Sequence, residues 1–144
     1  MAGLKKEYHI NKNDFIRAGE ASIKVKNVLK SLDVDPSIIR RVAICGYEGE
    51  MNVVMHGGDG KLNLEINPEN IVLDISDNGL GIADIEQAMT KGYSTATDEY
   101  REMGFGAGMG LPNMEKNADE FTIDSAVGEG TKIRMVFSLT HSKE

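Results

Sequence analysis

The sequence predicts an α+β fold, a two-layer sandwich in which about three helices cover a mostly antiparallel sheet. Two observations carry this prediction. Apolar residues recur with helical spacing between residues 25 and 32, and residues 62, 64 and 66 and then 71, 73 and 75 are apolar at every second position. The 144 residues contain no internal repeat, linker or low-complexity segment. We therefore expect residues 1–144 to form a single domain with one core.

The N-terminal segment is predicted to contain a short strand and a helix. Residues around Glu7 to Ile10 form the strand. Asn13 or Asp14 can cap the helix, which runs to about Ser31, because its apolar positions follow helical spacing.

A second helix is predicted from Pro36 to about His56. Asp35 is its N-cap, and proline is tolerated in the first turn because the missing N–H has no intrahelical partner there. Gly46 and Gly49 each cost this helix roughly 1 kcal/mol relative to alanine. Close packing against a neighbouring element explains them better than space for a ligand.

The period then changes from helical to strand-like. Residues 61–66 and 71–75 alternate, and the polar turn at 67–70 joins them, which predicts a hairpin with one buried face. Residues 82–103 hold a short helical pattern and a polar stretch that buries little, so a mobile loop is expected there.

The C-terminal segment is predicted to contain one helix and two strands. The helix runs from near Gly108 to near Asn117, and the first strand covers residues 121–124. A glycine turn at 128–130 leads into the last strand at 131–137.

Composition excludes several classes of function. The net charge is −7 and no long basic run is present, which disfavours direct contact with nucleic acid. No apolar segment is long enough for a signal peptide or a membrane span, so no membrane association is expected. The single cysteine, Cys45, lies among apolar residues of a predicted helix, which favours a buried thiol and a cytoplasmic location.

Glu48 and Asn52 are candidate chemical groups because they lie one helical turn apart and share a face. An amide oxygen and ATP phosphates suit Mg²⁺, and a neighbouring carboxylate can accept a proton. The same pair also occurs on ordinary solvated helix faces. Glu50 is rotated by about 200° from Glu48 and should face elsewhere. His56 is better explained by the helix dipole than by catalysis.

Two glycine segments suggest a nucleotide site. Asp77 ends a predicted strand, and Gly79 and Gly81 follow it, which also suits an ordinary turn. Gly104, Gly106, Gly108 and Gly110 precede or begin a helix, where free N–H groups favour an anion; a flexible loop is the alternative. No lysine and hydroxyl pair of a P-loop follows them, and the neighbouring strands do not suit a dinucleotide fold.

Four segments in order give the chain a resemblance to the GHKL (Bergerat-fold) ATPases. They are Glu48-x-x-x-Asn52, similar to the N box; Asp77-x-Gly79-x-Gly81 and Gly104 to Leu111, similar to the two glycine boxes; and Gly128 to Thr131, similar to the last box. The resemblance covers essentially the whole chain. The runs 84–89, 109–114 and 119–121 look most like the bacterial anti-sigma factor and switch-protein serine kinases.

The resemblance implies a role for each matching residue, with ATP and Mg²⁺ as cofactors. Glu48 would be the general base, Asn52 would hold Mg²⁺, and Asp77 would bind the adenine amino group with help from Thr131. The implied nucleotide-binding set is Asn52, Asp77, Gly79, Gly81, Ile82, Gly104, Gly106, Gly108, Met109, Gly110, Leu111 and Thr131. Lys91 and Arg101 are the candidates for a basic residue at the transferred phosphate.

The resemblance also implies partners. Such kinases phosphorylate a serine on a small STAS-domain protein, the antagonist of an anti-sigma factor, and some bind a sigma factor and form homodimers. A binding module gated by nucleotide, with little phosphoryl transfer, is the alternative. A histidine-kinase catalytic domain acting in trans is a third reading. Against it, no helix pair with a phospho-accepting histidine precedes the domain, since His9 falls in the opening strand.

Overall fold

The computed structural model describes residues 3–11, 17–56, 59–79, 110–126, 128 and 130–139. Its helices are α1 (Glu20–Ser31), α2 (Pro36–His56) and α5 (Gly110–Asn117). Its strands are β1 (Leu4–Ile10), β2 (Gly60–Ile66), β3 (Asn70–Asp77), β4 (Glu120–Ala126) and β5 (Gly130–Ser138). The predicted loop at 82–103 lies outside the described residues.

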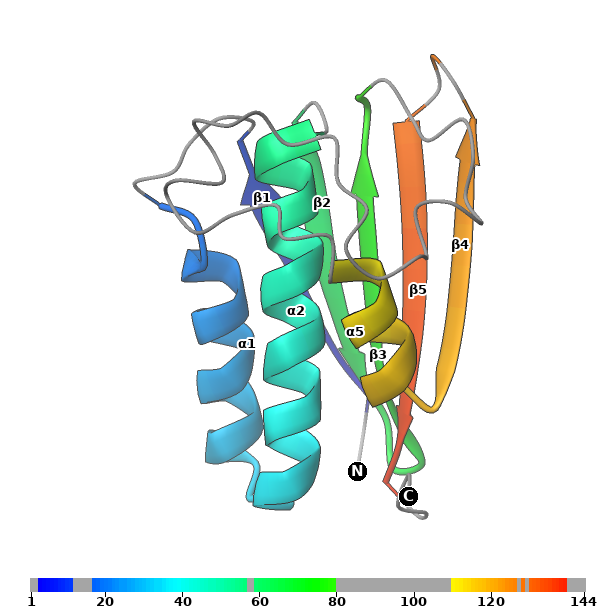
Figure 1. Ribbon diagram of the computed structural model, residues 1–144. Helices are drawn as coiled ribbons and strands as arrows, with labels where there is room; N and C mark the ends of the chain where they lie inside the picture. The colour runs from blue at the N-terminus through cyan, green and yellow to red at the C-terminus, as the bar shows by residue number, and fades with distance from the viewer. Residues whose placement is uncertain are drawn as a thin grey trace.

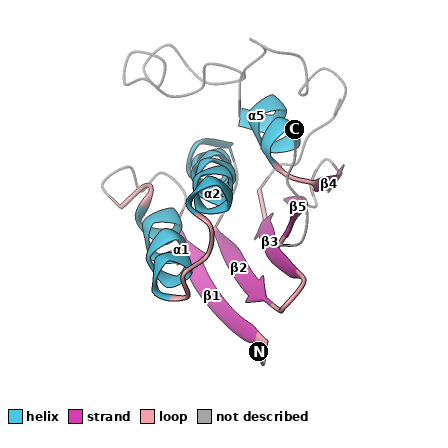
Figure 2. Cartoon of the chain, turned by 90° about the horizontal axis from the view of Figure 1, so that it is seen from below, coloured by secondary structure: helices cyan, strands magenta, loops and turns pink. Residues whose placement is uncertain are grey.

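The five strands form one antiparallel sheet in the order β1-β2-β3-β5-β4. All three described helices lie against the same face of this sheet (Figures 1 and 2). The predicted α+β sandwich is therefore confirmed. Strand β5 inserts between β3 and β4, which brings the last strand beside the end of β3.

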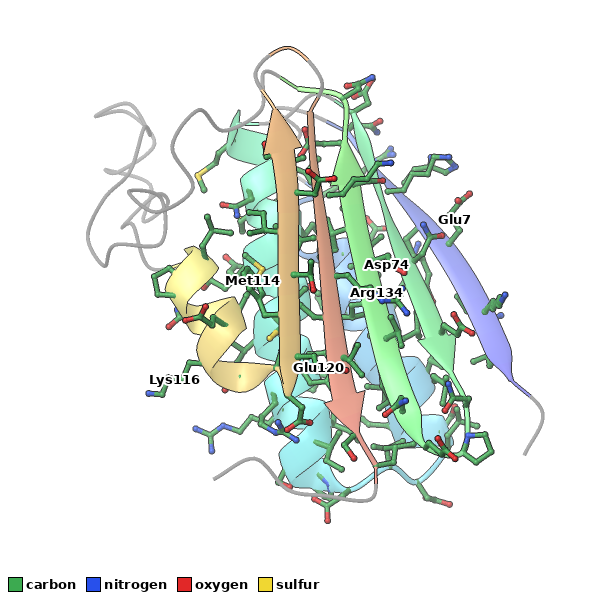
Figure 3. All side chains as sticks on the ribbon, turned by 90° about the vertical axis from the view of Figure 1, so that its right-hand side faces the viewer. Glu7, Asp74, Met114, Lys116, Glu120 and Arg134 are labelled. Atoms are coloured by element: carbon green, nitrogen blue, oxygen red, sulfur yellow. The ribbon has the colours of Figure 1, made fainter. Side chains whose placement is uncertain are left out.

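Alternation along the strands builds the core. Leu64 of β2 pairs with Leu73 of β3, which pairs with Met135 of β5, and each is at most 1% exposed. The opposite face is polar: Arg134 Nη1 lies 2.9 Å from Asp74 Oδ2, and both side chains point away from the helices (Figure 3). Val72, 4% exposed, is an exception on this outer face, while the other buried apolar residues of the strands belong to the core under the helices, as the period-two pattern predicts.

Strand β1 is longer than predicted. It begins at Leu4 rather than near Glu7, because it pairs with the whole of β2, from Leu4 opposite Ile66 to Ile10 opposite Gly60. Pairing with a neighbouring strand extends it through Lys5 and Lys6, where the sequence shows no alternation.

Helix α1 begins later than predicted. Arg17 to Gly19 form a turn, and the helix begins at Glu20 instead of near Asn13 or Asp14, two residues that lie outside the described part. Gly19 has φ of +93°, a left-handed conformation that interrupts a right-handed helix. The predicted end at Ser31 is confirmed.

Helix α2 has the predicted bounds and the predicted cap. Asp35 accepts hydrogen bonds from the Ser37 N–H at 2.8 Å and the Ser37 hydroxyl at 2.6 Å. These bonds hold the pKa of the exposed Asp35 carboxyl below its ordinary value, because they favour the charged form.

The packing explanation for the two glycines of α2 is confirmed. A β-carbon at Gly46 would lie 3.4 Å from Cβ of Ser22 in α1. A β-carbon at Gly49 would overlap the Ile75 side chain of β3. The glycines let α2 approach both neighbours closely.

Within the described residues, no helix is long and apolar enough to cross a membrane.

Candidate nucleotide site

The second half of α2 lies over the end of β3. Gly49 faces Ile75, and a β-carbon at Gly60 would lie 2.9 Å from a methyl group of Val53 and 3.2 Å from Cβ of Asp77. These contacts bring the helical turn from Glu48 to Val53 next to the strand end that bears Asp77. The structure therefore assembles two segments that the sequence separates widely.

Glu48 and Asn52 lie one turn apart on α2, as predicted, and both are half-buried. Burial raises the pKa of the Glu48 carboxyl above its ordinary value of 4.5, because desolvation disfavours the charged form. A hydrogen bond with the side chain of Asn113 acts in the opposite direction and only partly offsets this effect. A carboxylate with a raised pKa binds a proton more readily, which suits a general base.

Asn113 is a residue that the sequence analysis did not assign to the site. It lies in the first turn of α5, within the run that resembles the serine kinases. The only sequence feature that pointed to Asn113 was its position three residues after Gly110. The packing of α5 on α2, which brings Asn113 to Glu48, could not be predicted from the sequence.

Asp77 occupies a constrained position at the end of β3. Its Oδ1 accepts a hydrogen bond from the Gly79 N–H at 2.8 Å, so the Asp-x-Gly segment forms a tight turn around the carboxylate. Its direct cross-strand partner in β5 is Thr131. The two residues that the resemblance assigns to the adenine thus stand side by side.

Thr131 is held by a second residue that the sequence analysis missed. Its Oγ1 lies 2.8 Å from the Ser125 Oγ, and this Ser125 hydroxyl also donates to the Gly130 carbonyl at 3.1 Å. When Ser125 donates its proton to that carbonyl, Thr131 is the donor in the contact between the two hydroxyls, which leaves the Thr131 lone pairs as acceptors.

Gly130 allows the two strands to meet at Asp77. It has φ of +89°, and a β-carbon there would overlap the carbonyl oxygen of Asp77. A side chain at this position would push the end of β3 away from β5.

We expect Gly130→Ala to destabilise the protein by roughly 1–3 kcal/mol and to weaken ATP binding, because it adds left-handed strain and displaces Asp77. Urea unfolding and nucleotide titration measure the two effects. Gly128→Ala is the matched control: Gly128 also has a positive φ, of +83°, but open space around it. Equal losses of stability and of ATP affinity in the two variants would show that backbone strain alone, and not displacement of Asp77, causes the effect.

The remaining predicted site residues divide into two groups. Gly110 and Leu111 begin α5, and Leu111 is 7% exposed and packs in the hydrophobic core. Six others lie outside the described residues, namely Gly81, Ile82, Gly104, Gly106, Gly108 and Met109.

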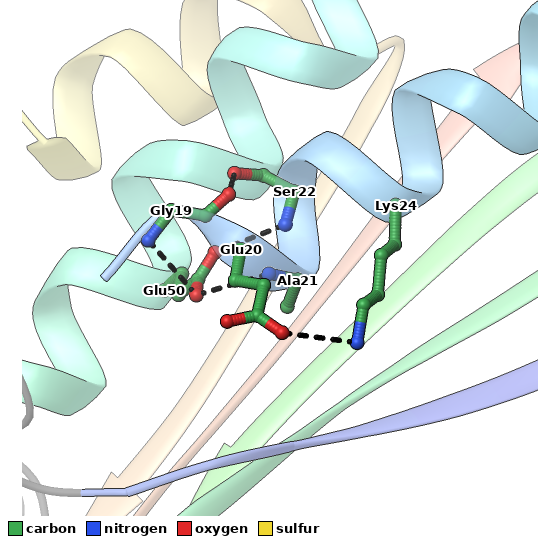
Figure 4. Close-up of polar contacts among 6 residues, drawn as sticks. All are labelled: Gly19, Glu20, Ala21, Ser22, Lys24 and Glu50. Carbon is green, nitrogen blue, oxygen red and sulfur yellow. Dashed lines mark hydrogen bonds and ion pairs between the residues drawn. The ribbon is translucent and has the colours of Figure 1, made fainter. Parts of the chain in front are cut away.

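Glu50 has a different role from Glu48, as its rotation around the helix predicts. The residue is 3% exposed, and its carboxylate accepts hydrogen bonds from three backbone N–H groups at the start of α1 (Figure 4). The distances are 3.0 Å from Gly19, 3.3 Å from Ala21 and 3.0 Å from Ser22. Glu50 therefore caps α1 from the neighbouring helix, in place of the local cap that the sequence suggested.

The fold and the site define a class of protein. Residues 47–141 match the family described as histidine kinase-, DNA gyrase B-, and HSP90-like ATPase. The chain belongs to this family, and ATP is the ligand that the domain implies.

Within this family, the chain is similar to anti-sigma factors and to a serine/threonine kinase. The chain is 31% identical over 129 residues to the anti-sigma F factor of Bacillus velezensis, covering 85% of each chain. It is 30% identical over 115 residues to the serine/threonine-protein kinase RsbT of Bacillus subtilis, covering 77% of this chain and 80% of that one. The predicted resemblance is confirmed.

A solved structure supports the fold alone. The mycobacterial sensor histidine kinase MprB matches with a TM-score of 0.53 at 15% identity, covering 94% of this chain and 97% of that one.

Proposed function

We propose that this protein is an ATP-dependent serine kinase of the anti-sigma and switch type, which phosphorylates a STAS-domain protein in a partner-switching pathway. One observation carries the proposal: a half-buried carboxylate, Glu48, lies one turn from Asn52 on a helix that crosses the strand end bearing Asp77. The similarity to RsbT and to the anti-sigma F factors supports it.

Each residue has a chemical task in this proposal. Asp77 and Thr131 accept hydrogen bonds from the adenine amino group, which selects adenine over guanine. Asn52 supplies an amide oxygen to Mg²⁺, and Glu48 accepts the proton of the attacking serine hydroxyl.

Mg²⁺ suits the residues that are present. Within the described ranges, no group of three histidine, cysteine or acidic side chains forms a metal site. A single amide oxygen fits Mg²⁺ because this ion is often held by few protein ligands, with phosphate oxygens and waters completing its shell. Mg²⁺ neutralises charge on the phosphates when bound.

The proposed partners extend beyond the substrate. A sigma factor is a second protein partner by analogy with the anti-sigma relatives, and a homodimer in the cytoplasm is the proposed assembly. The alternative function is a module whose nucleotide occupancy gates partner binding.

The test is incubation of the protein with radiolabelled ATP, Mg²⁺ and a candidate STAS-domain protein from the same genome. Label on one serine of that protein, identified by mass spectrometry, is the expected result. Nucleotide-dependent association without label would favour the binding module and overturn the kinase proposal.

We expect Asp77→Asn to weaken ATP binding by about 1.5–3 kcal/mol, a loss of roughly 10- to 150-fold, because an amide replaces a charged acceptor. Isothermal titration measures this loss. Asp74→Asn is the control, since Asp74 lies on the same strand but pairs with Arg134 on the polar face. Unchanged affinity in Asp77→Asn would refute the adenine assignment.

A further inference from the structure

Three neighbouring strands place one polar residue each in a single row near the end of the sheet. Ser125 of β4 lies opposite Thr131 of β5, and Thr131 lies opposite Asp77 of β3. Direct cross-strand partners share a face of the sheet, and this face is the helix side, because Ile75 and Ile133 lie two residues away along their strands and are buried in the core. Ser125 therefore flanks Thr131 on the side away from Asp77.

The Ser125 hydroxyl contacts two consecutive residues of β5. Its Oγ lies 3.1 Å from the Gly130 carbonyl oxygen and 2.8 Å from the Thr131 Oγ1. Thr131 is buried, with 9% of the residue exposed, which limits competition from water for its hydroxyl. Ser125 thus holds the residue whose hydroxyl the proposed function assigns to the adenine.

The number of protons sets the direction of these two hydrogen bonds. A carbonyl oxygen only accepts, whereas each hydroxyl has one proton to donate and two lone pairs. Ser125 can donate to Gly130 and also bond Thr131 only if Thr131 is the donor between the two hydroxyls. In that arrangement the Thr131 proton is used within the protein, and a ligand meets only the Thr131 lone pairs.

A hydroxyl that presents only lone pairs discriminates between two kinds of purine. The 6-amino group of adenine donates hydrogen bonds, whereas the 6-oxo group of guanine or hypoxanthine accepts them. A freely rotating hydroxyl can serve either group, because it can turn its proton toward an oxygen. A hydroxyl whose proton is held by Ser125 accepts from the amino group and leaves a 6-oxo group without a donor, which is costly in a buried site.

We propose that Ser125 is a positioning residue that strengthens the preference for a 6-amino purine by holding the proton of Thr131. This inference rests on the proposed function, in which Asp77 and Thr131 accept hydrogen bonds from the adenine amino group. Ser125 itself does not contact the nucleotide in this scheme, and it acts through Thr131. The Asp77 carboxylate and the oriented Thr131 hydroxyl then select the same group from two adjacent strands.

The first experiment compares the affinity for ATP with that for inosine triphosphate, which carries a 6-oxo group, by isothermal titration with Mg²⁺. The parent protein should prefer ATP. Ser125→Ala should reduce the ratio of the two affinities roughly two- to tenfold, and Ser125→Thr, which keeps the hydroxyl, should retain the parent ratio. Thr122→Ala is the matched control, because Thr122 is an exposed hydroxyl residue of the same strand, opposite Arg134. An unchanged ratio in Ser125→Ala, or an equal loss for both nucleotides, would overturn the proposal.

The second experiment tests whether Ser125 acts through Thr131. Thr131→Val removes the hydroxyl with little change in volume. In this background Ser125→Ala should alter the affinity ratio by less than about twofold, because no Thr131 proton remains to be held. Equal effects of Ser125→Ala with and without the Thr131 hydroxyl would contradict the inference.

These measurements are independent of phosphoryl transfer. A parent protein that binds ATP but transfers no phosphate would refute the kinase proposal, whereas the ratio of the two affinities would still decide the role of Ser125. A parent protein without a preference for ATP over inosine triphosphate would overturn the inference itself.

Discussion

Replacing Glu48 with alanine is expected to slow phosphoryl transfer by roughly two to four orders of magnitude and to leave ATP affinity nearly unchanged. The carboxylate is the one acidic group that α2 directs beside Asn52, and its loss removes the proton acceptor without removing a ligand of ATP. Single-turnover transfer to the STAS-domain protein, together with nucleotide titration, measures the two quantities separately.

The dependence of transfer on pH provides a further check of the same assignment. Burial raises the pKa of Glu48 in the folded protein, and a general base works only when deprotonated. Transfer by the parent protein should therefore fall as pH decreases through this raised pKa, at a higher pH than an ordinary glutamate would give. Glu48→Ala should lack this step. Equal transfer by Glu48→Ala and the parent protein would eliminate Glu48 as the base.

Replacing Glu50 with alanine is expected to destabilise the protein by roughly 3–5 kcal/mol. The change leaves three backbone N–H groups at the start of α1 without their acceptor and opens a cavity between the helices. A loss of this size is a large part of the stability of a small domain, so much of the variant should be unfolded at 37 °C. Urea denaturation followed by circular dichroism measures it.

Glu20→Ala is the control for this prediction. Glu20 lies in the first turn of the same helix, but it is exposed and pairs with Lys24 at 3.2 Å, a contact worth about 0.5 kcal/mol or less. Glu50→Gln keeps one acceptor oxygen and should lose less stability than Glu50→Ala. Similar unfolding midpoints for Glu50→Ala and Glu20→Ala would show that the buried cap does not hold α1.

The strands and α2 were predictable because their signals are local. Alternation over residues 61–75 determines both a hairpin and its buried face, and Asp35 with Pro36 marks the start of α2 within two residues. The start of α1 was not predictable in this way. Its cap is Glu50, 31 residues from Gly19, and no local pattern records a hydrogen bond between two helices.

The same distinction applies to the candidate site. Glu48 with Asn52, and Asp77 with Gly79, could be predicted because each pair lies within one turn of the chain. Asn113 and Ser125 could not, since each acts on a site residue through tertiary packing or strand register.

The close packing around the middle of α2 has a consequence for how this domain can change. Over six consecutive positions the helix meets a different neighbour at almost every residue: α5 at Cys45, α1 at Gly46, the candidate site at Glu48, β3 at Gly49 and α1 again at Glu50. Only Tyr47, 43% exposed, is turned to solvent. A single inserted or deleted residue here would rotate all contacts on one side of the change by about 100° relative to those on the other side. A substitution in this segment alters the contact with one neighbouring element at a time. A change of length would instead alter the position of the candidate site relative to the elements that hold α2 in place.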